Sequence, residues 1–305
     1  MSDDQLRIVI AVPTAGRPEG LSRLLHALPP STDPGLAAEV AVIDNEPSDE
    51  TRKAVKSVAG RLSWPITYVQ EPERGIPFAR NACVRTALDR DADALVFIDD
   101  DEWPEPGWLE ALVGTWRRTR ADVVVGPATV VLPKNAPEWA RRSKVFDKDR
   151  RLPEGAPIRT AYSYNTLVSR TALKTLGASF DPAFRYTGAS DHDYFKQAAA
   201  LGLVSVWSPD ARVYEEVDPA RLRPGWVFKR GYRIGAGVTR STLNRMGVLR
   251  SALRIALLFL ANLGWAGWHV LRSMRYRCVW VDALRRLGIA LGLVAGAVHS
   301  YEEYE

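Results

Sequence analysis

The chain has 305 residues, of which 46% are hydrophobic and 25% are charged, a composition typical of a globular protein with one large domain or two small ones. Its two cysteines exclude a scaffold held together by disulfides and favour a reducing compartment. The net charge of +5 is unevenly distributed, since residues 221–286 contain 14 Lys or Arg and one acid, whereas the rest of the chain has more acids than bases. This basic segment predicts an anionic ligand or surface in the C-terminal third.

Strands and helices alternate through the first 131 residues. Apolar, β-branched runs predict strands at residues 6–13, 39–44, 66–70, 94–98 and 122–131. The segments between them predict helices at residues 19–28, 49–59, 75–88 and 107–119. This alternation predicts an α/β fold, with a mostly parallel sheet that carries helices on both faces.

The pattern is less regular after residue 131. Residues 133–160 are rich in Pro, Lys, Arg and Asp, and they are predicted to form a mobile basic loop. Beyond this loop we expect strands at residues 162–169 and 203–207, an irregular segment at 181–187 and a helix at 191–201.

The C-terminal part is first basic and then apolar. Residues 224–243 are basic and aromatic, and residues 255–271 contain no Lys, Arg, Asp or Glu. Because a bilayer span needs about 20 predominantly apolar residues, we expect amphipathic helices that lie in a membrane interface, with flanking arginines toward anionic headgroups. A buried helical hairpin or a dimer interface is the alternative. The acidic N-terminus, followed at once by strand-like residues, predicts that there is no signal peptide.

Four acids, residues 99–102, directly follow the apolar strand predicted at residues 94–98. In open α/β sheets, ligands bind at the carboxyl ends of the strands. If the extended backbone persists, Asp99 and Asp101 point to the same side and repel each other unless a cation lies between them. Their oxygens suit Mg²⁺ or Mn²⁺. Alternatively, the acids only stabilise the N-terminus of the next helix.

Three other predicted strand ends carry polar residues, namely Thr14-Ala15-Gly16-Arg17, Asp44-Asn45 and the segment from Arg74 to Asn81. Each is unspecific alone, because an Asp after a strand can cap a helix and a lone Arg can be solvated on one. In this order and spacing, together with the acidic run, they resemble family 2 glycosyltransferases, which have a GT-A fold. The resemblance covers residues 6–215.

The resemblance implies roles for individual residues. The implied nucleotide-sugar-binding residues are Pro13, Thr14, Arg17, Asp44, Arg80, Asp99 and Asp100. Asp101, with Asp99 nearby, is implied to hold Mn²⁺ or Mg²⁺, which would stabilise the charge of the diphosphate leaving group.

Residues 188–193 resemble the acceptor-side motif of the family. The resemblance implies that Asp191 is the general base that takes the proton of the acceptor hydroxyl, and a helix N-cap is the alternative role. Ser190 stands where the family commonly has Glu, so Asp193 could substitute for that acid. Asn165 and Trp103 are further acceptor-side candidates, with a structural hydrogen bond and core packing as their respective alternatives.

The sequence therefore predicts a GT-A domain over residues 1–220, with a nucleotide-sugar half at 1–130 and an acceptor half at 131–220, followed by a helical, membrane-associated tail at 221–305. We expect an inverting, metal-dependent glycosyltransferase that acts at the cytoplasmic membrane face on a lipid-linked saccharide and binds no nucleic acid. Residues 99–104, 213–216 and 301–304 further resemble the succinoglycan-type exopolysaccharide branch of the family.

Two other functions stay open at this point. A sugar nucleotidyltransferase also needs a nucleotide fold and metal carboxylates, but no Gly-rich phosphate loop follows the first predicted strand. A catalytically silent, membrane-bound protein that binds nucleotide or saccharide is the third possibility, because Ser190 replaces an acid of the motif.

Overall fold

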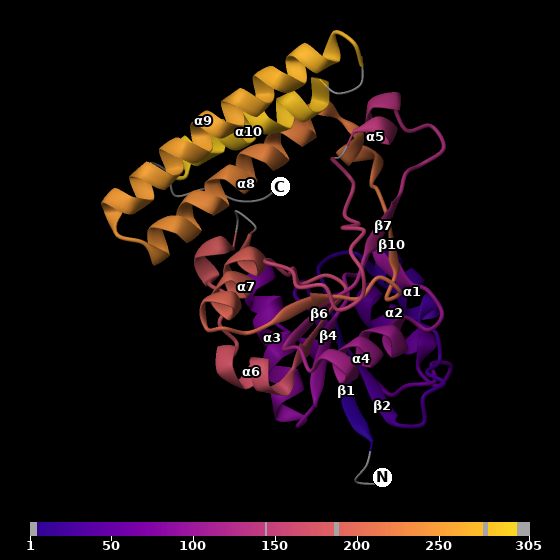
Figure 1. Ribbon diagram of the computed structural model, residues 1–305. Coiled ribbons are helices and arrows are strands. Elements are labelled where there is room, and N and C mark those ends of the chain that lie inside the picture. Colours follow the sequence, from indigo (N-terminus) through magenta and orange to yellow (C-terminus); the bar gives the residue numbers. More distant parts are fainter. Residues whose placement is uncertain (1–4, 144, 186–188, 277–279, 298–305) are drawn as a thin grey trace. The chain divides into compact units, whose positions relative to one another are not determined.

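The computed structural model describes residues 5–143, 145–185, 189–276 and 280–297 (Figure 1). The chain divides into two compact units. Unit 1 comprises Met1–Thr129, Lys148–Pro182 and Ser190–Glu215, and unit 2 comprises Val130–Asp147, Ala183–Ala189 and Glu216–Glu305. The predicted division into donor and acceptor halves stays a prediction.

A seven-stranded sheet forms the centre of unit 1, with the order β3-β2-β1-β4-β8-β6-β9. Its strands are β1 (Leu6–Thr14), β2 (Leu36–Asp44), β3 (Ile66–Gln70), β4 (Ala94–Phe97), β6 (Val123–Val125), β8 (Thr166–Ser169) and β9 (Ser205–Trp207). All neighbours pair in parallel except β8, which runs antiparallel to both β4 and β6. The prediction of a mostly parallel sheet is confirmed.

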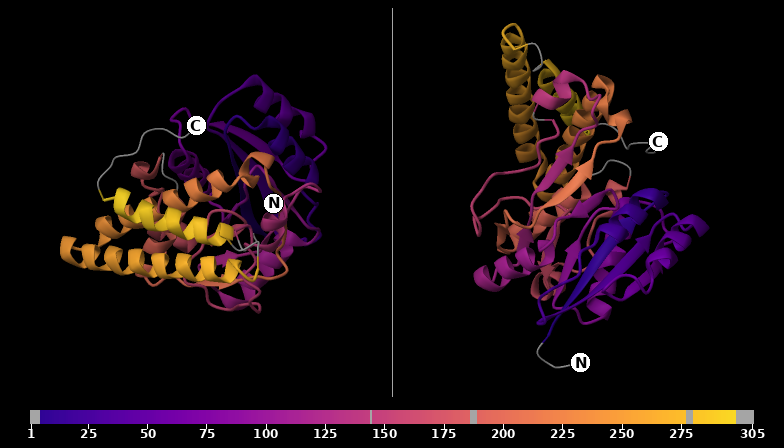
Figure 2. Two further views of the ribbon diagram at one scale, coloured as in Figure 1. Left: turned by 90° about the horizontal axis from the view of Figure 1, so that it is seen from above. Right: turned by 90° about the vertical axis from the view of Figure 1, so that its right-hand side faces the viewer.

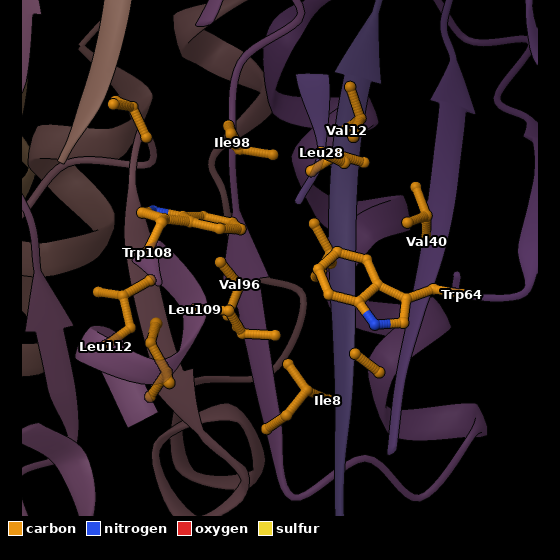
Figure 3. Packing of buried hydrophobic residues seen from close by; sticks show 14 of the residues in the cluster. Ile8, Val12, Leu28, Val40, Trp64, Val96, Ile98, Trp108, Leu109 and Leu112 are labelled. Atoms are coloured by element: carbon orange, nitrogen blue, oxygen red, sulfur yellow. The ribbon is translucent and has the colours of Figure 1, made fainter. Parts of the chain in front are cut away.

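Helices cover both faces of this sheet, as predicted. They are α1 (Pro18–Ala27), α2 (Asp49–Val58), α3 (Ile76–Asp89), α4 (Trp108–Thr119), α6 (Arg170–Leu176) and α7 (Ser190–Ala200). Because side chains alternate along a strand, Ile8 and Ile10 of β1 pack with α1, α2 and α4, whereas Val9 packs with α3, α6 and α7. Figure 3 shows the first of these cores, in which Trp64 lies near Val40.

The predicted strand at residues 122–131 is wrong as a single element. It breaks at Gly126 and Pro127, so that β6 stays in the large sheet while β7 (Ala128–Val131) enters a second, three-stranded sheet of order β5-β10-β7. A side chain at Gly126 would collide with the backbone oxygen of Ala211, and Pro127 has no N–H to donate to a ladder. The strands β5 (Glu102–Pro104) and β10 (Val213–Glu216) were not predicted.

The extended backbone expected at residues 99–101 is also absent. Strand β4 ends at Phe97, and the chain turns so that the backbone N–H of Glu102 donates to the oxygen of Asp99 at 3.1 Å. The acids therefore occupy a turn, which we call the acidic turn (residues 99–101), between β4 and β5.

Three long helices make up most of unit 2: α8 (Pro224–Arg245), α9 (Val248–Ser273) and α10 (Trp280–Ala295). They lie side by side in all views (Figures 1 and 2). Helices α8 and α10 approach through glycines, since a side chain at Gly235 would collide with the backbone oxygen of Ile289, and one at Gly292 with that of Tyr232. Such backbone-to-backbone packing of small residues is typical of helices in membranes.

Helix α9 has the length and apolar composition that a membrane crossing requires, and 11% of its most apolar window is buried. Unit 2 also contains α5 (Glu138–Arg142), which forms inside the segment predicted as a loop. Two short 3₁₀ helices, Pro182–Phe184 and Pro219–Leu222, complete the described elements. Residues 186–188 and 301–304, which contributed to the predictions, lie outside the described residues.

Candidate active site

The acidic turn connects to the end of β1 through Asp100. Asp100 Oδ2 accepts a hydrogen bond from Thr14 Oγ1 at 2.7 Å, and Asp100 Oδ1 lies 3.2 Å from Arg17 Nη1. Arg17 also reaches Asp101, at 3.4 Å, and its side chain remains 54% exposed. Burial raises the pKa of Asp100, and Arg17 opposes this rise. Thr14 and Arg17 thus contact an acid that lies more than 80 positions later in the chain, and Arg17 offers its guanidinium to solvent.

Asp99 and Asp101 lie close enough to repel each other. Burial raises the pKa of Asp99 to about 7, the charge of Asp101 adds to the rise, and Arg80 and Lys148 oppose it. A cation would relieve this surplus of negative charge, and carboxylate oxygens are ligands that Mg²⁺ and Mn²⁺ prefer. The residues therefore fit a divalent ion.

Within the described residues, no three His, Cys, Asp or Glu side chains are grouped so that they could hold a metal ion by themselves. An ion at the acidic turn would complete its coordination with water or with oxygens of a substrate. This is how Mg²⁺ is commonly bound, by one or two carboxylates together with substrate phosphates.

Asp44 lies at the end of β2 with no exposed surface. Its Oδ2 accepts a hydrogen bond from the Tyr68 hydroxyl at 2.7 Å, and its Oδ1 accepts one from Glu46 N at 3.1 Å. The neighbouring Asn45 accepts a hydrogen bond from Gly75 N at 2.7 Å and so ties the end of β2 to the start of α3. A carboxylate oxygen can accept a second hydrogen bond, so the contact of Asp44 with a nucleotide base stays a prediction.

Arg80 joins helix α3 to the start of helix α7. Its Nη1 donates to Ser190 Oγ at 2.8 Å, and its guanidinium carbon lies 5.9 Å from the centre of the Phe180 ring. The buried Nε has no hydrogen-bond partner among the described residues. The charge of Arg80 also acts on Asp99, where it opposes the rise in pKa that burial causes.

Asp191 lies in the first turn of α7, where a negative charge favours the helix N-terminus. Its Oδ1 accepts a hydrogen bond from the backbone N of His192 at 2.7 Å, and its side chain is half-buried. Asp193, two residues further on, is 8% exposed. Of these two acids, Asp191 is the more accessible to a substrate, and its role as a base stays a prediction.

The two remaining acceptor-side candidates have structural contacts. Asn165 is fully buried, with its Oδ1 accepting from Trp108 Nε1 at 2.6 Å and its Nδ2 donating to the backbone oxygens of Pro127 and Ala211. We therefore leave Asn165 out of the acceptor site. Trp103 is half-buried and stacks on Tyr214, with ring centres 5.9 Å apart.

Three charged residues near the acidic turn were missed by sequence reasoning: Glu102, Lys148 and Glu215. Glu102 and Glu215 face each other across β5 and β10, and Lys148 Nζ forms an ion pair with Glu215. No sequence signal connects them, because they come from three separate segments and meet only when β10 pairs with β5. Glu102 was noticed as part of the acidic run but was given no role of its own.

Comparisons with known proteins identify the family of this chain. The model of the family "Glycosyl transferase family 2" matches residues 9–177. The chain is 34% identical over 260 residues to the succinoglycan biosynthesis protein ExoM of Rhizobium meliloti, an alignment that covers 84% of this chain and 82% of that protein. It is 24% identical to the glycosyltransferase AglE of Haloferax volcanii, over 84% of this chain and 80% of the relative.

Among solved structures, the mannosyltransferase PcManGT from Pyrobaculum calidifontis, in complex with GDP-Man and Mn²⁺, superposes with a TM-score of 0.62 at 19% identity. The match covers 96% of this chain and 86% of that one. The likeness confirms the GT-A fold with its additional C-terminal helices. The family match over more than half of the chain, together with the 34% identical relative, shows that this chain is a glycosyltransferase and belongs to glycosyl transferase family 2.

Proposed function

We propose that the enzyme transfers a sugar from a nucleotide-sugar donor to a saccharide acceptor, with inversion at the anomeric carbon and with the help of Mn²⁺ or Mg²⁺. The observation that carries the proposal is the contact between the end of β1 and the acidic turn. Thr14 and Arg17 reach the turn from the end of β1, and Asp99 and Asp101 belong to it. The charge of Arg80, which donates to Ser190 at the start of the helix that carries Asp191, acts on Asp99.

We propose that the donor diphosphate binds next to the acidic turn. The exposed guanidinium of Arg17 and the charge of Arg80 offer cationic partners for phosphate oxygens. Pro13 and Thr14 at the end of β1, and Asp44 at the end of β2, are placed beside the nucleoside. The bound GDP-Man and Mn²⁺ of the similar mannosyltransferase support this assignment.

Asp191 is the proposed general base. The acceptor hydroxyl attacks the anomeric carbon from the face opposite the diphosphate, its proton goes to the Asp191 carboxylate, and the bond between the anomeric carbon and the diphosphate oxygen breaks. Asp99 and Asp101 would hold the divalent ion, which supplies positive charge to the departing diphosphate. Arg17 and Arg80 stabilise the same developing charge from the protein side.

The acceptor is proposed to be a lipid-linked saccharide at the cytoplasmic membrane face. Helix α9 exposes large apolar side chains, with Leu249 85%, Leu253 64% and Leu260 64% accessible. Basic residues flank this surface at Arg250, Arg254, Arg272 and Arg275. An apolar helix flanked by arginines is suited to a bilayer interface that contains anionic lipids.

One polar contact favours a helix that lies in the interface over one that crosses the bilayer. Arg286 of α10 donates to Asn262 Oδ1, near the middle of α9, at 3.2 Å. A crossing helix would hold this arginine near the centre of the bilayer, where a charge is costly. In a helix lying flat, the same contact faces the protein and the leucines face lipid.

The test has two steps. Thermal shift of the full chain against UDP, GDP, CDP and dTDP, each with and without Mn²⁺, identifies the nucleotide, because a ligand of the folded state raises stability by about 2.7 kcal/mol at a hundredfold excess over its Kd. Sugars on that nucleotide are then offered with lipid-linked saccharides, and NMR reads the anomeric configuration of the product. Transfer with inversion supports the proposal.

Release of pyrophosphate from a nucleoside triphosphate and a sugar phosphate would instead indicate a nucleotidyltransferase. Transfer with retention would contradict the in-line displacement by the acceptor hydroxyl.

A further inference from the structure

Two buried glutamates face each other directly across the antiparallel pair β5 and β10. Glu215 and Glu102 are register partners, and they are 6% and 1% exposed. Like charges placed opposite each other in a sheet destabilise it, and burial makes each charge more costly. Such a pair needs a compensating cation or a function that retains it.

Lys148 provides the cation. Its Nζ pairs with Glu215 Oε2 and lies 4.7 Å from the centre of the Tyr164 ring. Its charge also acts on Glu102 and on Asp99, which belongs to the acidic turn. One ammonium group therefore balances three carboxylates only in part.

Glu102 connects this network to the acidic turn through one carboxylate oxygen and its backbone N–H. Its Oε2 accepts a hydrogen bond from the backbone N of Asp99 at 3.0 Å. Its Oε1 is buried and has no hydrogen-bond partner among the described residues. The Glu102 backbone N–H closes the same turn by donating to the Asp99 oxygen at 3.1 Å. Glu102 thus binds both the backbone N–H and the backbone C=O of Asp99.

We propose that Glu102, backed by Glu215 and Lys148, is a positioning residue that fixes the acidic turn in the shape in which Asp99 and Asp101 hold the divalent ion. The effect of Glu102 on metal binding rests on the proposed metal-dependent transfer. Its effect on the shape of the turn can be tested without metal or substrate. In this proposal Glu102 acts through the backbone of the acidic turn and is not itself a ligand of the ion.

Three substitutions at residue 102 separate the hydrogen bond from the charge. Glu102→Gln keeps the length of the side chain and an acceptor oxygen, Glu102→Asp keeps the charge but shortens the reach, and Glu102→Leu removes both. Two quantities are measured on the full chain: hydrogen exchange of the Asp99 amide without metal, and the Kd for Mn²⁺ in the presence of a saturating nucleoside diphosphate.

The proposal expects Glu102→Asp and Glu102→Leu to speed exchange of the Asp99 amide about tenfold or more and to weaken Mn²⁺ binding by a similar factor. Glu102→Gln should stay within about threefold of wild type in both measurements. Lys148→Met should resemble the Leu variant, and Lys148→Arg should resemble wild type, because the arginine keeps the charge beside Glu215.

The control is Glu154→Gln, which removes a carboxylate that accepts from Thr115 Oγ1 and pairs with Arg118 elsewhere in unit 1. It should leave both readings unchanged. If Glu102→Leu does not fold, the comparison of Glu102→Asp with Glu102→Gln still decides.

Unchanged exchange of the Asp99 amide and unchanged Mn²⁺ affinity in Glu102→Asp would overturn the proposal. If Glu102→Asp exchanges faster but the wild type binds no Mn²⁺, the role of Glu102 in holding the turn is supported and only the proposed metal-dependent function is contradicted.

Discussion

The two units of the molecule differ in where they place their large apolar side chains. Unit 1 buries its large apolar residues between the sheet and the helices, and charged residues lie at the ends of its strands. Helix α9 of unit 2 leaves Leu257, Trp265 and Trp268 more than half exposed, and α8 and α10 pack through glycines. The difference agrees with the proposal that unit 1 performs the chemistry and that unit 2 contacts an apolar surface.

The largest expected effect tests the proposed catalytic role of unit 1. Asp191→Asn should lower kcat about 10²- to 10⁴-fold, because the amide cannot take the proton of the acceptor hydroxyl. Asp193→Asn, which changes a more buried acid of the same helix, should cost much less. Steady-state kinetics of both variants provide the measurement, and a larger loss in Asp193→Asn would move the base to that residue.

The second prediction tests the glycine packing of unit 2. Gly292→Leu should destabilise the packing of α8 on α10 by more than about 3 kcal/mol, because a side chain there would collide with the backbone of Tyr232. Thermal unfolding followed by circular dichroism measures the loss.

Gly264 of α9 is the matched control, because a side chain there meets no atom within 4 Å. Gly264→Ala should be neutral or raise stability by up to about 1 kcal/mol, since alanine favours helix. Equal losses at the two positions would contradict the close approach of α8 and α10.

The third prediction tests the exposed surface of α9. The double variant Leu253→Glu/Leu260→Glu should bind vesicles that contain anionic lipid at least about thirtyfold more weakly, because burying a leucine contributes about 1.5 to 3 kcal/mol. Sedimentation with vesicles measures the partition. Leu201→Glu changes a leucine of unit 1 that is 55% exposed, and it should have no effect. Equally weakened vesicle binding in the α9 double variant and in Leu201→Glu would contradict the assignment of membrane binding to unit 2.

The last prediction concerns the dependence of stability on pH. Because the pKa of Asp99 is raised to about 7, the folded state without metal holds a proton that the unfolded state has released between about pH 4 and pH 7. Stability should therefore fall as pH rises through this window, by at most about 1.4 kcal/mol per unit. Denaturant unfolding at several pH values measures the slope. Asp99→Asn should flatten it, and an unchanged slope in that variant would assign the titration to another group.

The sequence predicted the parallel part of the sheet well, because local patterns determine it. Strand β3 has the predicted bounds, and β1, β2 and β4 differ from theirs by three residues or fewer. Each of these strands contains apolar or β-branched residues and is followed by a polar segment, so a local signal gives the strand and the position of the polar residues at its end.

The missed elements depend on partners far away in the chain. Strand β5 is a three-residue strand formed from acidic and aromatic residues, and only its pairing with β10, more than a hundred residues later, makes it a strand. The hydrogen-bond partners of Asn165 could not be predicted for the same reason, since they lie at Trp108, Pro127 and Ala211. A pattern within one short segment cannot show such contacts.

Calorimetry of nucleotide binding tests the central claim most directly. The nucleoside diphosphate identified by thermal shift is titrated into wild type and into Asp101→Asn, each with and without Mn²⁺. If the acidic turn holds the ion, Mn²⁺ should tighten binding to wild type about tenfold or more and should have little effect on Asp101→Asn. Equal tightening in both proteins would place the ion elsewhere and contradict the account.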